Sequence, residues 1–125
     1  MPFDSERAAR VAYAAIRQLR EEQGQSRGPV WELLVPEERS WYRRAVELAA
    51  IGVRLPNIHD DWRRGLEQSG WACGPDIDHV KKSHPGLLPW PALSDDQRRR
   101  LSVLQMITMA LSLDVMSGPV PVTPL

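Results

Sequence analysis

Residues 71–93 contain four prolines and two glycines, which limits the secondary structure that this part of the chain can form. Proline lacks a backbone donor and clashes with the preceding helical turn, so the segment cannot form a regular helix. A connection of this length is uncommon in a small domain unless its own side chains dock it on the core. Six apolar side chains can serve as anchors: Trp71, Val80, Leu87, Leu88, Trp90 and Leu93. We therefore expect an ordered loop.

The sequence around this loop is patterned for helices, with apolar residues at three- and four-residue spacing. Asp4 or Ser5 can cap the first helix, Pro36 fits the first turn of the second, and Ser94 to Gln97 forms a capping box before the last. Glycines, with Pro56 after the second helix, are placed to end them. The predicted helices span 5–23, ending at Gly24; 36–52, ending at Gly52; 57–69, ending at Gly70; and 94–116, ending at Gly118.

The helical pattern also predicts which side chains are buried. These are Ala8, Val11, Ala12, Ala15, Ile16 and Leu19 in the first helix; Trp41, Ala45, Leu48 and Ala49 in the second; Ile58, Trp62 and Leu66 in the third; and Leu101, Leu104, Thr108, Leu111 and Val115 in the last. Trp31 is also expected in the core. The prediction is an all-α, single-domain bundle of about four helices over residues 1–118, followed by a flexible tail at 119–125.

Length and charge narrow the class of protein. A chain of 125 residues suits one domain, and its 16 basic residues balance its 16 acidic ones. This balance argues against nucleic-acid binding, which depends on excess positive charge. The start of the chain has no signal-peptide pattern, and polar residues interrupt the most apolar stretch, 101–116. The single cysteine cannot form an intramolecular disulfide. Together these features predict a soluble, cytoplasmic protein without membrane contact.

No pattern of residues predicts catalysis. The candidate metal ligands, from His59 to His84, lack a zinc-binding motif, so we expect no metal site. Cys73 could pair with His79 or His84, but a lone cysteine is more typical of a small buried apolar residue. Glycine-rich phosphate loops are absent from the sequence. We expect a protein that is not an enzyme and needs no cofactor.

Four short motifs, in this order and spacing, carry a family resemblance. They are Ile58-His59-Asp60-Asp61-Trp62, Gly70-Trp71-Ala72-Cys73-Gly74-Pro75, Lys81-Lys82-Ser83-His84-Pro85 and Leu88-Pro89-Trp90. The sequence resembles the ryanodine receptor repeat, or RyR domain, over about residues 6–100, in the manner of stand-alone bacterial or phage members. It departs from the family pattern at Cys73, where tyrosine is usual, and at Trp90, where tyrosine or phenylalanine is usual.

The resemblance implies an α-helical fold with a small β-like loop and a binding role, including the sensing of nucleotide-derived ligands in bacterial or phage conflict systems. For such a ligand, tryptophan faces could stack on a base and lysines could contact phosphate. The ligand-binding residues implied in this way are Trp62, Trp71, Lys81, Lys82, His84 and Trp90.

Other interpretations of the same residues remain open. Trp71 and Trp90 could simply pin the loop, His84 could satisfy backbone groups, and the lysines could be solvated. A different function is a protein-interaction module or homo-oligomer, docking through an apolar strip formed by Met106, Met109 and Met116. A hydrolase that uses the His84 region is the third possibility.

Overall fold

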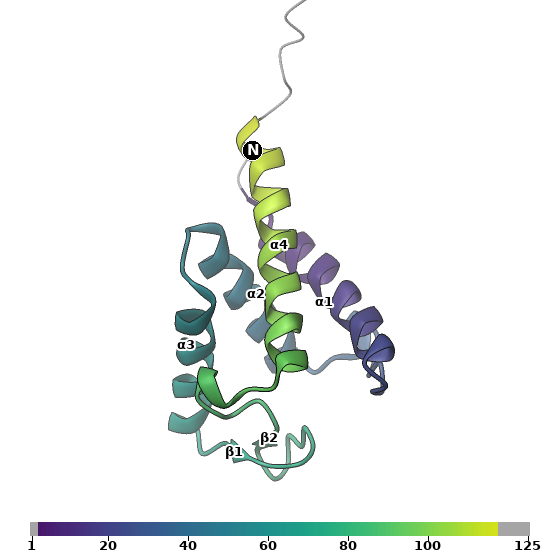
Figure 1. Ribbon diagram of the computed structural model, residues 1–125, viewed down its shortest axis with the longest axis vertical. Helices are drawn as coiled ribbons and strands as arrows, with labels where there is room; N and C mark the ends of the chain where they lie inside the picture. Colours follow the sequence, from purple (N-terminus) through teal and green to yellow (C-terminus); the bar gives the residue numbers. More distant parts are fainter. Residues whose placement is uncertain (1–2, 118–125) are drawn as a thin grey trace, which may run out of the picture.

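The computed structural model describes residues 3–117, so the predicted tail at 119–125 lies outside the described residues. Figure 1 shows the helices packed together, with a loop containing β1 and β2 at one end of the molecule. The fold is mostly α-helical, as the sequence predicts. In chain order the elements are α1 (Ser5–Glu22), η1 (Trp31–Leu33), α2 (Pro36–Ala50), α3 (Leu55–Gln68), β1 (Ala72–Cys73), β2 (Ser83–His84), η2 (Trp90–Ala92) and α4 (Asp95–Ser117).

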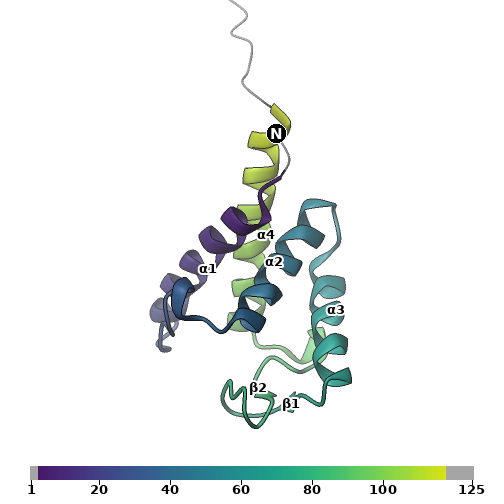
Figure 2. The same ribbon diagram turned by 180° about the vertical axis from the view of Figure 1, so that it is seen from behind.

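Helix α2 lies at the centre of the bundle and contacts α1, α3 and α4. The chain direction shows that α1 and α4 run in opposite directions against each other, while α3 packs on the other side of α2 (Figures 1 and 2). One hydrophobic core joins these helices. Its buried members are Ala8, Ala9, Ala12, Tyr13, Ile16, Trp31, Leu34, Val46, Ala49, Ile58 and Leu104.

The helix ends follow the predicted capping chemistry, with one correction. Asp4 accepts a hydrogen bond from the backbone N–H of Arg7 and caps α1. The capping box of α4 is formed in both directions, between Ser94 and Gln97. Pro56, however, does not terminate α2 but lies in the first turn of α3, where a missing N–H costs no helical hydrogen bond. Helix α3 therefore begins at Leu55 rather than at residue 57.

Two predicted buried faces are partly wrong. Val11 is 42% exposed, and Ala9 and Tyr13 are buried instead, so the inward face of α1 is rotated from the predicted one. On α2, the prediction missed Val46, which is fully buried. Trp31 lies in the core as expected, whereas Trp41 is half-buried and packs with a second cluster near the loop. The side chain of Val115 lies outside the described residues.

The loop after α3 is ordered, as predicted, and contains the β-like element. Strands β1 and β2 pair in parallel, with Ala72 opposite Ser83 and Cys73 opposite His84. Gly70 permits the sharp exit from α3, because its φ of 90° is a conformation that favours glycine. The predicted anchors Trp71, Leu87 and Leu93 are buried, while Leu88 and Trp90 are half-buried.

Two predictions about the loop are wrong. Val80 is not an anchor but is 93% exposed at the tip of the turn between the two strands. Cys73 is exposed rather than a buried apolar residue. It lies in a strand whose two residues are both exposed.

Candidate functional site

Five rings meet where the loop packs on α2 and α3, and we call this group the aromatic–histidine cluster: Trp41, Trp62, Trp71, His79 and His84. Trp41 of α2 is its centre. The Trp41 ring stacks on His79 with a centroid distance of 5.6 Å, and it meets Trp71 edge-on at 5.3 Å. His84 meets Trp62 edge-on at 4.7 Å. These are favourable aromatic geometries, so the cluster holds the loop on the helices.

The three predicted tryptophans of the site differ in accessibility. Trp71 is only 4% exposed and packs with Leu66 and Leu87, which agrees with its interpretation as a loop anchor. Trp62 and Trp90 are half-buried and both contact His59, with centroid distances to its ring of 5.6 and 6.0 Å. Part of each of these two indoles is therefore accessible to solvent, unlike most of the Trp71 ring.

The two predicted lysines occupy a turn that is held by Asp78. The carboxylate of Asp78 accepts hydrogen bonds of 2.9 Å from the backbone N–H groups of Lys81 and Val80, and these bonds lower the pKa of Asp78. Lys82 has a φ of 55°, and its Nζ donates to the carbonyl oxygen of Ser69 at the end of α3. Both lysines are exposed, but Lys82 already has a structural hydrogen bond that ties the turn to α3.

His84 has a defined role in the backbone of the loop. The N–H of Gly86 donates to His84 Nδ1 at 2.8 Å, so this nitrogen is unprotonated in the fold. Burial, followed by the positive charges of Arg20 and Arg100, lowers the pKa of His84 from 6.5 to about 4. The imidazole is therefore neutral at pH 7, and Nε2 carries its hydrogen.

Sequence reasoning missed two histidine contacts that position the loop. His79 Nε2 donates to Oε1 of the buried Glu38 at 3.0 Å and fixes the ring that stacks on Trp41. His59 Nε2 donates to the carbonyl oxygen of Leu88 at 2.6 Å, and burial lowers its pKa. Spacing along the chain gives no sign of the Glu38–His79 contact, because the two residues are 41 positions apart. His59 lies within the first family motif, which was the available signal.

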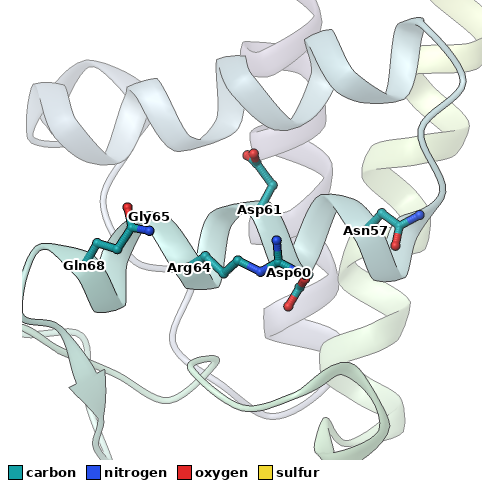
Figure 3. A pocket seen from close by; sticks show the side chains of 6 residues that line it. All are labelled: Asn57, Asp60, Asp61, Arg64, Gly65 and Gln68. Atoms are coloured by element: carbon teal, nitrogen blue, oxygen red, sulfur yellow. Dashed lines mark ion pairs between the residues drawn. The ribbon is translucent and has the colours of Figure 1, made fainter.

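A shallow hollow of about 470 Å³ lies along the outer face of α3, away from the cluster (Figure 3). It is lined by Asn57, Asp60, Asp61, Arg64, Gly65 and Gln68. Its carboxylates are already paired, since Asp60 contacts Arg64 at 2.5 Å and Asp61 contacts Arg44 of α2 at 3.3 Å. In Figure 3 Asp61 points towards α2 and away from Asp60, so the two carboxylates do not face a common point.

Two general features complete the description of the site. Among the described residues, no three histidine, cysteine or acidic side chains come together as a metal site would require. Within the same part of the chain, no helix is both long enough and apolar enough to cross a membrane.

The fold and the site define a small helical domain whose proline-rich loop is fastened to the helices by aromatic rings. A family model described as the RyR domain matches residues 31–116, which is more than half of the chain, and the chain belongs to the RyR domain family. The match begins after α1, so this helix is additional to the matched region. RyR domains are binding or interaction modules in general. A search of curated proteins found no match.

Proposed function

We propose that this RyR domain is a non-enzymatic binding module for a nucleotide-like small molecule. The observation that carries the proposal is that two half-buried, partly accessible indoles, Trp62 and Trp90, lie near the same buried ring, His59. Stacking of a base on an aromatic side chain contributes about 1–3 kcal/mol, and every base offers a flat face. Lys81 is exposed in the same loop, three residues before His84, whose ring meets Trp62 at 4.7 Å, and we assign its ammonium group to the phosphate.

The proposal assigns the six sequence-predicted residues to two roles. Trp62 and Trp90 contact the base, and Lys81 contributes positive charge. The other three residues hold the loop in place. Trp71 does so through its buried ring, Lys82 through its hydrogen bond to Ser69, and His84 through the hydrogen bond it accepts from Gly86. A neutral His84 does not attract phosphate at pH 7, because its pKa is about 4.

Calorimetry with mono-, di- and cyclic nucleotides and ADP-ribose at modest salt tests this function. We expect micromolar binding of at least one compound, and a loss of tenfold or more in the double variant Lys81→Ala/Lys82→Asn. Asparagine tolerates the positive φ at position 82 better than alanine, but it removes the hydrogen bond from Lys82 Nζ to Ser69. The single variant Lys81→Ala, which keeps that bond, is therefore measured beside the double variant and should lose most of the same affinity. The melting temperature of the variant provides the folding control. If no compound binds, or if the double substitution does not change the affinity, the nucleotide proposal is wrong.

A second candidate function is self-association through α4. Met106, Met109 and Leu113 are 61%, 53% and 61% exposed and lie on one face of the helix, within a run from Leu101 to Leu113 that has no charged residue. A two-fold interface needs only one such self-complementary patch, so a second copy of the chain is the proposed partner. The side chain of Met116, predicted to extend this strip, lies outside the described residues.

Sedimentation of the protein at micromolar concentration tests the second candidate. A dimer that dissociates in Met106→Lys/Met109→Glu, with unchanged helicity, would support it. A wild-type monomer up to about 100 μM, far above typical affinities for specific complexes, would refute it.

A further inference from the structure

The C-terminal end of α1 and the N-terminal end of α4 are joined by side-chain hydrogen bonds. Gln23 Nε2 donates to the carbonyl oxygen of Asp96 at 3.1 Å. Arg100 Nη1 donates to Gln23 Oε1 at 3.0 Å and to Gln25 Oε1 at 2.6 Å. Because the two helices run in opposite directions, the turn of α1 before Gln23 lies beside the turn of α4 that follows Asp96 (Figure 1).

Arg20 occupies that turn of α1, three residues before Gln23 and on the same face of the helix. Its Nη2 donates to the hydroxyl of Tyr42, on the central helix α2, at 3.4 Å. Arg20 and Arg100 are both half-buried. Two guanidinium groups, from α1 and α4, are therefore held at the junction of three helices.

Among the side chains that the structure describes, these two arginines have only neutral partners. In the part of the chain that the structure describes, seven other arginines form ion pairs: Arg10, Arg27, Arg43, Arg44, Arg63, Arg64 and Arg98. Arg20 and Arg100 instead contact a phenol and two amide groups, and neither makes an ion pair with a carboxylate among the side chains that the structure describes, residues 3–113. A half-buried cation without a counter-ion is costly, so the pair is a place where an anion would be stabilised.

The electrostatic environment agrees with this geometry. Burial lowers the pKa of Arg100, and the charge of Arg20 lowers it further. Two carboxylates act on this region: Asp96 favours the charged form of Arg100, and Glu38 raises the pKa of Tyr42. Glu38 is hydrogen-bonded to His79 rather than to either arginine.

We propose that Arg20 and Arg100 form a binding site for a phosphate group, with the Tyr42 hydroxyl and the side-chain amides of Gln23 and Gln25 as neutral hydrogen-bonding partners. Guanidinium groups bind phosphate oxygens through two parallel hydrogen bonds, and two of them from different helices can hold one tetrahedral anion. The group can belong to a free phosphate or pyrophosphate, or to a nucleotide. The inference rests on the proposed function for the identity of the whole ligand, but not for binding of the phosphate itself.

Titration calorimetry with pyrophosphate, and separately with ADP, tests the site on the full chain. We expect wild-type protein to bind pyrophosphate, and Arg20→Gln and Arg100→Gln each to weaken this binding tenfold or more. Arg99→Gln is the matched control, because this exposed arginine is the neighbour of Arg100 on α4 and its replacement removes the same charge. The control should change the affinity by less than twofold. Arg100→Lys keeps the positive charge but lacks the planar guanidinium group, so it should bind pyrophosphate more tightly than Arg100→Gln does. This variant tests the site even if Arg100→Gln does not fold.

The outcomes separate this site from the nucleotide proposal. Pyrophosphate binding that depends on Arg20 and Arg100, without any nucleotide binding, would support the site and refute the proposed nucleotide function. ADP binding that depends on Lys81 but not on either arginine would refute the site and leave the nucleotide function standing. The site is also refuted if wild-type protein shows no heat with millimolar pyrophosphate, or if Arg99→Gln weakens binding as much as Arg100→Gln does.

Discussion

Replacement of His84 should change how the stability of the domain depends on pH. The imidazole has a pKa of about 4 in the fold against 6.5 ordinarily, because it is buried, near two arginines, and accepts the Gly86 N–H at Nδ1. Between these two values the unfolded chain binds a proton at His84 and the folded chain does not. Stability is therefore complete above about pH 6.5 and is lost as the pH falls towards 4.

The size of the effect follows from the two pKa values of His84. One pKa unit corresponds to about 1.4 kcal/mol, so full titration costs about 3 kcal/mol, and about 2.5 kcal/mol is already lost at pH 4.5. His59, whose pKa is also lowered by burial, contributes in the same direction. Carboxylates titrate in this range too, so the effect of His84 must be measured as a difference between two proteins.

The variant His84→Asn supplies that difference, because its Oδ1 can accept the Gly86 N–H and its side chain does not titrate. Urea unfolding followed by tryptophan fluorescence gives the free energy of unfolding at pH 7.5 and 4.5. We expect wild-type protein to lose about 2.5 kcal/mol more than the variant over this interval. Equal losses in the two proteins would refute the reasoning. An NMR titration of wild-type protein checks it independently, since the ring protons of His84 should titrate near pH 4.

Three other substitutions test the packing of the loop and α3. Trp71→Ala should lower the free energy of unfolding by about 3–5 kcal/mol because the ring is 4% exposed, and a melting temperature within a degree of wild type would contradict this. Gly74→Ala should cost about 1–3 kcal/mol in urea unfolding, since the new Cβ would lie 2.7 Å from Ser83 Cβ in the paired strand. Gly65→Ala, with open space around the new methyl group, should instead stabilise the protein by about 0.5–1 kcal/mol; destabilisation at this helical position would show that the space is needed.

The sequence was sufficient for the helices because the signals that define them are local. Asp4, the Ser94–Gln97 capping box and Gly24 act on residues within one turn, and the structure confirms each of them. Pro56 was misassigned because proline both follows helices and begins them, and only the chain direction after residue 52 decides between the two. Val11 was misplaced because a stripe of small alanines can turn its face by tens of degrees without changing the pattern.

The candidate site was harder to predict because its contacts join distant segments. The family motifs contain Trp62, His84 and Trp90, but they do not indicate which rings are accessible to solvent and which, such as Trp71, are buried. Trp41 was expected in the core, and no local pattern places it between two histidines of the loop. Arg20 and Arg100 are 80 positions apart in the sequence, so only the three-dimensional structure shows that neither has an acidic partner among the described side chains.

The two hydrophobic clusters make the loop a part of the molecule that can open alone. The cluster of Leu66, Trp71 and Leu87 shares no buried side chain with the core around Leu104, so undocking of residues 71–93 leaves that core closed. Such local opening requires less free energy than global unfolding. The amides of Ala72 and Gly74, which donate to the carbonyl oxygens of Lys82 and His84, would then exchange with solvent faster than those inside α1. A ligand that contacts only the docked loop would slow exchange at these amides alone, so the loop would report occupancy without any change in the helices.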